Sequence, residues 1–392
     1  MHNDTVSLLQ SDAAPMRRLA KRTSHPRRPT RMRRLAPAVS GGNRDGSPSP
    51  AGSRPARFFA CGEEWSYFFL GARLTVWLFL LASALAVSAA VKEVGPIRIT
   101  VGDLDQAMHF YTEVLPFREV TRFEEQGRPL KNLTGTAGAR ARVARLRLGA
   151  EQIELVDWLH AEGRPIPADS RSFDHWFQHI AIVVSDMDRA YEHLRRHRVK
   201  HVSTAPQTLP DWNPNAGGIK AFYFRDPEDH VLEIIWFPPG KGDPRWQQTD
   251  GRGTFLGIDH TAIVVGDTER SLAFYRDELG LQVAGASENH GIEQERLNQV
   301  FGARLRITAL RAKSGPGIEF LEYITPPGGR QIPADRRIED LASWMVVLHE
   351  DFADTDLKTR AAASRRLLQD PDGHSLLVLR EPPKSAAAES SK

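Results

Sequence analysis

The sequence predicts an α+β protein made of four related modules, each with the order strand, helix and then three strands. Three stretches share the same opening, a short apolar strand followed by an aspartate that caps a helix: GPIRITVGDLDQAMHFY, FQHIAIVVSDMDRAYEHL and GIDHTAIVVGDTERSLAFY. The repeat also has a longer period, because Asp103 and Asp267 lie 164 residues apart. Strands such as VARLRLG alternate in polarity, so each sheet must bury one face or line a cavity with it. Together these observations predict two domains of tandem βαβββ modules.

Residues 1–65 are predicted to form a disordered basic leader, because they are rich in Arg, Pro, Ser and Gly and have no apolar period. Residues 1–73 hold 13 Lys and Arg against 5 Asp and Glu, in a chain of 392 residues with a net charge of +3. The rest of the chain is therefore mildly acidic, and a nucleic-acid partner is not expected.

An apolar segment lies within residues 66–91. Its core, LTVWLFLLASALAVSAAV, carries no charge, and Ser88 and Ala90 are spaced as in a signal-peptidase site. Two interpretations stay open. In the preferred one the segment is a cleaved signal peptide, the mature protein starts near Val91, and it is exported to the periplasm or the cell exterior. In the other, the segment is a membrane anchor of just sufficient length.

The folded part is predicted to divide into a first domain, residues 92–238, and a second, residues 256–381. The Gly- and Pro-rich segment 239–255 would link them, and residues 382–392 would form a disordered tail. The fourth module is short and is expected to be incomplete. The near-identical segments RPIPADSR and RQIPADRR follow modules one and three. They favour pairing module one with two and module three with four, since consecutive elements usually pack as neighbours.

Several motifs resemble those of the vicinal oxygen chelate superfamily, which includes glyoxalase I, bleomycin-resistance proteins and extradiol dioxygenases. They are a histidine in the first strand of modules two and three, FYRDELGL after a helix, DPEDH before a last strand, and a glutamate within that strand. The resemblance covers residues 94–380. It implies that two modules close into a cupped sheet around one divalent metal ion, with ligands from the first and last strands of both modules.

The resemblance, carried over position by position, implies metal ligands at the first-strand histidines and last-strand glutamates. This set is Glu154, His179, Glu233, His260 and Glu319. Module four lacks both ligands: Trp344 or Met345 stands at the histidine position, and Leu377 stands at the glutamate position. Module one lacks only the histidine, because Pro96 stands at that position.

The favoured pairing of modules would collect Glu154, His179 and Glu233 in the first domain, with Glu154 or Glu233 as the candidate catalytic base. An alternative pairing, of module two with module three, would instead collect His179, Glu233, His260 and Glu319. Imidazole and carboxylate ligands suit Mn, Fe(II), Ni or Zn.

The implied function is a glyoxalase-like lyase or isomerase whose metal binds two adjacent oxygens of a small substrate. A non-catalytic binding protein of the bleomycin-resistance type stays open. An extradiol dioxygenase ranks lower, because that variant uses two histidines and one glutamate, which the favoured ligand set does not reproduce. Trp212, Asn213 and Tyr223 lie in or beside a Gly- and Pro-rich loop and are candidate substrate contacts. A homodimer also stays open.

Overall fold

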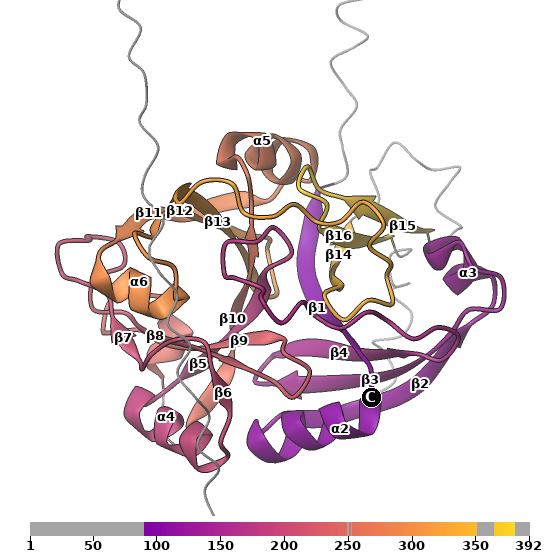
Figure 1. The fold of residues 1–392 in the computed structure, drawn as a ribbon, viewed down its shortest axis with the longest axis horizontal. Coiled ribbons are helices and arrows are strands. Elements are labelled where there is room, and N and C mark those ends of the chain that lie inside the picture. The colour runs from indigo at the N-terminus through magenta and orange to yellow at the C-terminus, as the bar shows by residue number, and fades with distance from the viewer. Residues whose placement is uncertain (1–89, 249–250, 252, 351–363, 381–392) are drawn as a thin grey trace, which may run out of the picture. The chain divides into compact units, whose positions relative to one another are not determined.

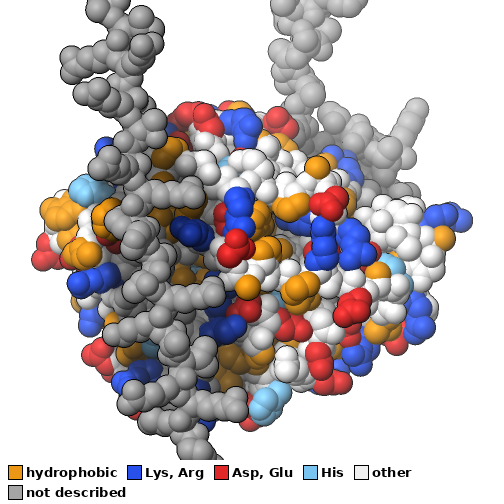
Figure 2. Space-filling view, viewed as in Figure 1, with side chains coloured by type: hydrophobic (Ala, Val, Ile, Leu, Met, Phe, Trp, Pro, Cys, Tyr) orange, Lys and Arg blue, Asp and Glu red, His pale blue; other side chains and the backbone are white. Residues whose placement is uncertain are grey.

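The computed structural model describes residues 90–248, 251, 253–350 and 364–380. Within them the chain is a mixed α+β fold with two sheets, which confirms the predicted class at that level. The leader, the tail 382–392 and all but the last two residues of segment 66–91 lie outside these ranges, so the signal peptide and the anchor stay predictions. In the described part of the chain, no helix combines the length and apolarity needed to span a bilayer. Acidic and basic side chains are interspersed over the face shown in Figure 2.

Modules one and three repeat the same elements in the same order (Figure 1). Module one comprises β1 (Val91–Val101), α2 (Leu104–His109), η1 (Phe110–Val114), β2 (Arg118–Gln126), α3 (Arg128–Thr134), β3 (Arg140–Leu148) and β4 (Glu151–Trp158). Module three comprises β10 (Phe255–Val264), α5 (Thr268–Leu272), η3 (Ala273–Glu278), β11 (Gln282–His290), α6 (Ile292–Asn298), β12 (Arg304–Arg311) and β13 (Gly317–Thr325). Asp103 and Asp267 cap the helices by accepting backbone N–H bonds, as the repeat predicts.

Modules two and four are built more loosely on the same plan. Module two comprises β5 (Gln178–Val184), α4 (Met187–Arg196), β6 (Lys200–His201), β7 (Gln207–Thr208), β8 (Lys220–Arg225) and β9 (Val231–Trp236). Module four comprises β14 (Trp344–Glu350), β15 (Ser364–Gln369) and β16 (Ser375–Arg380). Its segment 351–363, where a helix would fall, lies outside the described residues. A short 3-10 helix, η2 (Pro244–Gln247), precedes module three.

The two sheets join module four to module one and module two to module three. The seven-stranded sheet has the order β15-β16-β14-β1-β4-β3-β2, and the nine-stranded sheet has the order β11-β12-β13-β10-β5-β9-β8-β6, with β7 beside β8. The joints are the antiparallel pairs of β1 with β14 and of β10 with β5, which lie side by side in Figure 1. The predicted pairing of module one with two and three with four is therefore wrong, and the alternative is right.

Modules one and two pack as neighbours, as do modules three and four, but through their buried faces rather than through strand pairing. One apolar cluster combines Tyr111 of module one with Ile182 of module two, and a second combines Tyr275 of module three with Leu376 of module four. The neighbour rule is thus satisfied by the hydrophobic cores. The edges of β1 and β5 then pair with strands from the other half of the chain, which explains the failed prediction.

The two IPAD linkers hold each other in a reciprocal clasp. Each linker contributes one arginine that pairs with two aspartates of the other: Arg164 with Asp335 and Asp340, and Arg330 with Asp169 and Asp174. A β-carbon at Gly163 would collide with the backbone oxygen of Glu339, and one at Gly329 with that of Phe173, so both approaches require glycine. The similarity of the linkers therefore reflects their contact with each other and says nothing about which modules share a sheet.

Candidate metal centre

Four polar side chains meet in the middle of the nine-stranded sheet, on the neighbouring strands β9, β5, β10 and β13. They are Glu233, His179, His260 and Glu319, and we call their shared face the metal cup. Glu233 lies beside Ala181, and Glu319 lies beside Ala262. Because residues two apart on a strand share a face, each glutamate points to the same side as the histidine of the neighbouring strand. The small alanines leave room between these side chains.

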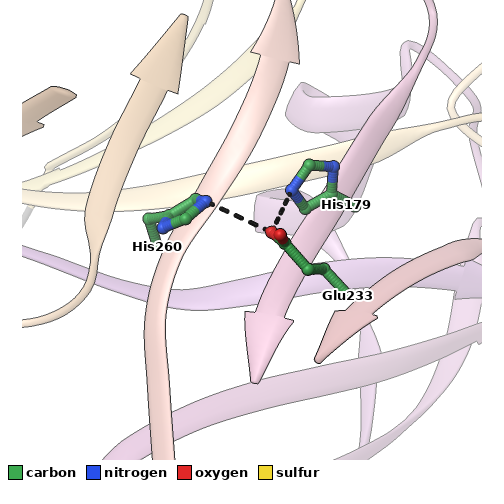
Figure 3. Close-up of side chains that lie close together, drawn as sticks. All are labelled: His179, Glu233 and His260. Atoms are coloured by element: carbon green, nitrogen blue, oxygen red, sulfur yellow. Dashed lines mark hydrogen bonds and ion pairs between the residues drawn. The ribbon is translucent and has the colours of Figure 1, made fainter. Parts of the chain in front are cut away.

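The imidazoles of His179 and His260 both face the carboxylate of Glu233 (Figure 3). Oε2 of Glu233 lies 3.0 Å from Nε2 of His179 and 3.6 Å from Nε2 of His260. Oε1 of Glu319 lies 3.5 Å from the same His260 nitrogen. The candidate ligand atoms of His179, Glu233 and His260 all lie within 4.8 Å of one another, and all three residues are buried.

The residues present fit a divalent metal ion. Nε2 of His260 is buried and has no hydrogen-bond partner, although two carboxylate oxygens lie 3.5 and 3.6 Å away. These separations exceed a normal hydrogen bond, so a cation between the groups would satisfy the nitrogen and neutralise the two buried carboxylates. Two imidazole nitrogens and two carboxylates form a donor set that suits Mn, Fe(II), Ni or Zn.

A carboxylate behind His260 fixes the orientation of its ring. Oδ2 of Asp259 lies 3.0 Å from Nδ1 of His260, and this carboxylate also accepts bonds from Arg311 and from Nε1 of Trp246. Such a carboxylate–histidine pair is the usual support for a metal-binding imidazole. Burial acts to raise the pKa of Asp259, but its bonds to His260 and the charge of Arg311 outweigh this and hold the pKa well below its usual range.

The acidic surroundings also change the protonation of the metal-free cup. Burial acts to lower the pKa of His260, but the charges of Glu319 and Asp259 outweigh it and raise the pKa to about 9. Burial raises the pKa of Glu319, and the charge of His260 only partly opposes the rise. A metal ion entering the cup must therefore displace a proton from His260.

His179 lacks the support that His260 has. Gln178 occupies the position equivalent to Asp259, and its amide donates to the hydroxyl of Thr261 instead. Nδ1 of His179 is buried without a hydrogen-bond partner, and its ring centroid lies 4.8 Å from that of Tyr223. The two imidazoles therefore occupy equivalent strand positions in unequal environments.

Sequence reasoning missed the residues that support His260. Asp259 could have been recognised from the sequence, because it directly precedes His260. The residue that directly precedes His179 is a glutamine, Gln178. Trp246 lies in the segment 239–255 that was expected to be only a linker, yet it is buried and bonded to Asp259. Arg311, near the end of β12, carries no local signal because its contact spans 52 residues.

A cavity of about 1380 Å³ connects the metal cup with the inner face of the seven-stranded sheet. Of the three candidate substrate contacts, Tyr223 lines this cavity. Trp212 is half exposed and stacks on His290 at 4.3 Å. Asn213 is buried and donates to Oδ1 of Asn289, so it holds its own loop in place. Neither Trp212 nor Asn213 lines the cavity.

Glu154, the expected third ligand beside His179 and Glu233, lies on β4 in the other sheet. Its Oε1 accepts from Nη2 of Arg145 at 2.6 Å, and its Oε2 lies 3.0 Å from Nε of Arg98. The predicted convergence of Glu154 with His179 and Glu233 is wrong, because β4 pairs within the seven-stranded sheet and not beside β5. Both of its oxygens are paired with guanidinium groups of its own sheet.

Comparison with known proteins identifies the family. The model for the Glyoxalase/Bleomycin resistance protein/Dioxygenase superfamily matches residues 93–234 and 257–378. A curated relative, 2-epi-5-epi-valiolone epimerase from Actinomyces sp, is 35% identical over 161 residues, which cover 40% of this chain and 84% of the relative.

The solved structures that match this chain are more distant in sequence. A mutant of glyoxalase I from Zea mays is 17% identical, covers 75% of this chain and 94% of its own, and gives a TM-score of 0.47. A glyoxalase family protein from Bacillus cereus is 19% identical, covers 39% and 98%, and gives a TM-score of 0.30. The family-model matches span more than half of the chain, which therefore belongs to the Glyoxalase/Bleomycin resistance protein/Dioxygenase superfamily.

Proposed function

We propose that this protein is a metal-dependent epimerase or isomerase that moves a proton on a carbon adjacent to a carbonyl of a small substrate. The observation that carries the proposal is the meeting of two histidines and two glutamates in the metal cup, of which Glu233, His260 and Glu319 line a large cavity. The relative that is named an epimerase supports the reaction type.

The metal would be held by His179, Glu233, His260 and Glu319. When bound, a divalent ion supplies Lewis-acid stabilisation of the negative charge that grows on a substrate oxygen as the proton leaves. With these side chains as ligands, the ion would bind two adjacent oxygens of a small substrate such as a hydroxy-ketone.

Glu319 is the carboxylate best placed to move the proton. Its side chain is 20% exposed, whereas that of Glu233 is 5% exposed and has Oε2 between the two imidazoles. Oε2 of Glu319 accepts no hydrogen bond from any described residue, so it can turn toward a substrate in the cavity. We therefore assign the role of base to Glu319 in place of Glu154 or Glu233.

Tyr223 would hold the substrate from the opposite side of the cup. It lies directly across from Glu233 in the antiparallel pair of β8 and β9, so both side chains share the cavity face. Burial, followed by the charge of Glu233, raises the pKa of Tyr223 well above its usual value. The phenol stays protonated at neutral pH and can donate a hydrogen bond to a substrate oxygen.

Hydrogen exchange tests the proposal on model ketones, whatever the natural substrate is. Protein loaded with Mn or Zn is incubated in D₂O with a panel of hydroxy-ketones, and deuterium at the carbon next to the carbonyl is followed by NMR. Glu319→Gln should abolish the exchange, while Glu154→Gln, in the other sheet, should leave it intact. If the wild-type protein binds metal and ketone but exchanges no deuterium, it is a binding protein and the proposal fails.

A second candidate is an Fe(II)-dependent oxygenase of the extradiol type. One observation favours it, because the three residues that lie closest are two histidines and one glutamate, the set used by many non-haem iron oxygenases. An oxygenase was ranked lower because the favoured set of Glu154, His179 and Glu233 contains only one histidine, but the residues that the structure brings together contain two. Oxygen uptake by Fe(II)-loaded protein with a catechol would support this candidate, and Glu319→Gln should then retain uptake, since the three closest ligands remain.

A further inference from the structure

A second cavity lies among module one, module two and the start of module three, and it gathers arginines from the first two. Its volume is about 640 Å³, and its floor includes the apolar side chains of Leu148 and Leu256. The arginines that line it are Arg118, Arg147, Arg189 and Arg196, and its acidic lining residue is Glu113. We call this cavity the arginine groove. The concentration of one charge sign contrasts with the interspersed charges of the face in Figure 2.

Two of these arginines face each other across a strand pair. Arg118 on β2 lies directly opposite Arg147 on β3 in the antiparallel register. Like charges at directly opposite positions destabilise a strand pair. No acidic side chain among the described residues pairs with either guanidinium group. The chain therefore tolerates an unfavourable arrangement here that a single substitution would remove.

Helix α4 adds basic side chains from the other side. Arg189, His193 and Arg196 follow the spacing of four and then three residues that places side chains on one helical face. Nε2 of His193 donates to the backbone oxygen of Val114 at 2.7 Å, which holds this face against η1. Arg196 is in the last turn, where a cation suits the helix dipole, and it lies 3.7 Å from Glu192. Arg189 is in the first turn, where the dipole disfavours a cation, and no described acidic side chain pairs with it.

We propose that the arginine groove binds a small molecule through a phosphate or diphosphate group. Planar guanidinium groups donate paired hydrogen bonds to phosphate oxygens, and a bound anion would relieve the repulsion between Arg118 and Arg147 and offset the unfavourable position of Arg189. The apolar floor would contact the rest of the ligand, and the volume lies in the range of small-molecule sites. The groove shares no lining residue with the cavity at the metal cup, so this proposal does not rest on the metal or on the proposed reaction.

Titration of metal-stripped protein with inorganic pyrophosphate tests this proposal by calorimetry at constant ionic strength. Wild-type protein should bind, with an affinity that falls as salt rises. The double variant Arg118→Gln with Arg147→Gln should bind at least tenfold more weakly. The matched control is Arg128→Gln, because Arg128 is an exposed arginine on α3 without an ion pair among the described residues. The control should bind as the wild type does.

Thermal unfolding supplies the second readout. Pyrophosphate should raise the Tm of the wild type and leave that of the double variant unchanged, and without pyrophosphate the double variant should be at least as stable as the wild type. Lower stability of the double variant without ligand would mean that the arginines serve the fold, which overturns the proposal. Equal stabilisation of the wild type by sulfate at the same ionic strength, or no binding at all, would do so too.

Discussion

The two sheets carry equivalent ligand positions with different residues in them. In the metal cup, Ala181 and Ala262 lie beside Glu233 and Glu319, and the residues two positions before the alanines are the histidines. The seven-stranded sheet has the same register, in which Arg98 lies beside Glu154 and Val347 lies beside Leu377. Two positions before Arg98 and Val347 are Pro96 and Met345. These are the positions at which the resemblance implied a missing ligand, and the register selects Met345 rather than Trp344 in the fourth module.

The seven-stranded sheet has an ion-pair cluster at the positions equivalent to those of the candidate metal ligands. Glu154 is buried, and a buried carboxylate needs a cation. Arg98 and Arg145 supply that charge permanently, and Arg98 also pairs with Glu125 at 2.8 Å. We call this group the arginine cup. A fixed guanidinium group thus stands where the other sheet leaves space for an exchangeable ion.

The largest expected effect is on metal binding by the two histidines. His179→Ala and His260→Ala should each lower the metal affinity by at least about 100-fold, because each removes a direct ligand from the same cup. Glu154→Gln should leave the affinity unchanged. Metal titration by calorimetry on all three variants is the measurement. If His260→Ala still binds metal tightly, then module three does not contribute a ligand to the site that contains His179 and Glu233 of module two.

Rebuilding the lost ligands tests the comparison in the opposite direction. The variant Pro96→His, Arg98→Ala, Met345→His and Leu377→Glu reproduces the metal cup in the seven-stranded sheet. It should raise the metal content from one to two ions per chain, measured by elemental analysis after dialysis. The control is Arg98→Ala alone, which should stay at one ion. The control should also lose about 3 kcal/mol of stability, because it removes one partner of a buried ion pair. If the wild-type protein already binds two metal ions per chain, the claim that arginine takes the place of a metal ion in the seven-stranded sheet is refuted.

Local sequence signals were sufficient for the elements and for most of the site. Asp103, Asp186 and Asp267 cap helices because each precedes an amphipathic run, and these contacts span only a few residues. His179, Glu233, His260 and Glu319 were named as candidate ligands because the resemblance to the superfamily places ligand positions in each module. The repeat itself, however, is equally compatible with either pairing of modules.

The pairing of modules depends on contacts that no local pattern encodes. Strand β1 can pair along its free edge with any strand of suitable polarity, and its partner β14 lies some 250 residues away. The choice follows from two apolar clusters that join consecutive modules by their buried faces, which leaves the other edges for sheet formation. Glu154 was misassigned for this reason alone, since its position within its own module is correct.

The support of His260 should show a smaller effect than loss of a ligand. Asp259→Asn should reduce metal affinity by about 10- to 100-fold, because the imidazole loses the carboxylate that orients it. Gln178→Ala, at the equivalent position beside His179, should leave the affinity unchanged, and equal losses would contradict the asymmetry of the two histidines. Calorimetry at fixed pH is the measurement.

His260 should make the stability of the metal-free protein and the metal affinity change in opposite directions with pH. The pKa of His260 is raised to about 9 in the metal-free protein, above its usual value of about 6.5. Its protonated form therefore adds stability that is complete below about pH 6.5 and is lost as the pH rises through 9. Metal affinity should increase over the same interval, because fewer protons compete. Urea midpoints of metal-free protein that rise between pH 6.5 and 9 would refute the assignment.

The smallest effect concerns the clasp, the region in which the two halves of the chain have stayed alike. Burial acts to raise the pKa of Asp340, but its bonds to Arg164 outweigh this and lower the pKa to about 2. The bond from Arg330 likewise lowers the pKa of Asp169. Carboxylates with a depressed folded-state pKa add stability above about pH 4, and that stability is lost as the pH falls toward 2.

Because the two linkers contact each other reciprocally, Arg164→Gln and Arg330→Gln should lower the urea midpoint at pH 7 by similar amounts. Both variants should also lose less stability between pH 4 and pH 2 than the wild type does. Without the arginine, the pKa of each paired aspartate in the folded state returns toward its unfolded-state value, so its protonation no longer destabilises the fold. The control is Arg122→Gln, which breaks an exposed pair with Glu119 and should change the midpoint little. Markedly unequal effects of the two clasp variants would mean that the two linkers contribute unequally to the stability of the fold, in the way that the two cups differ in their residues.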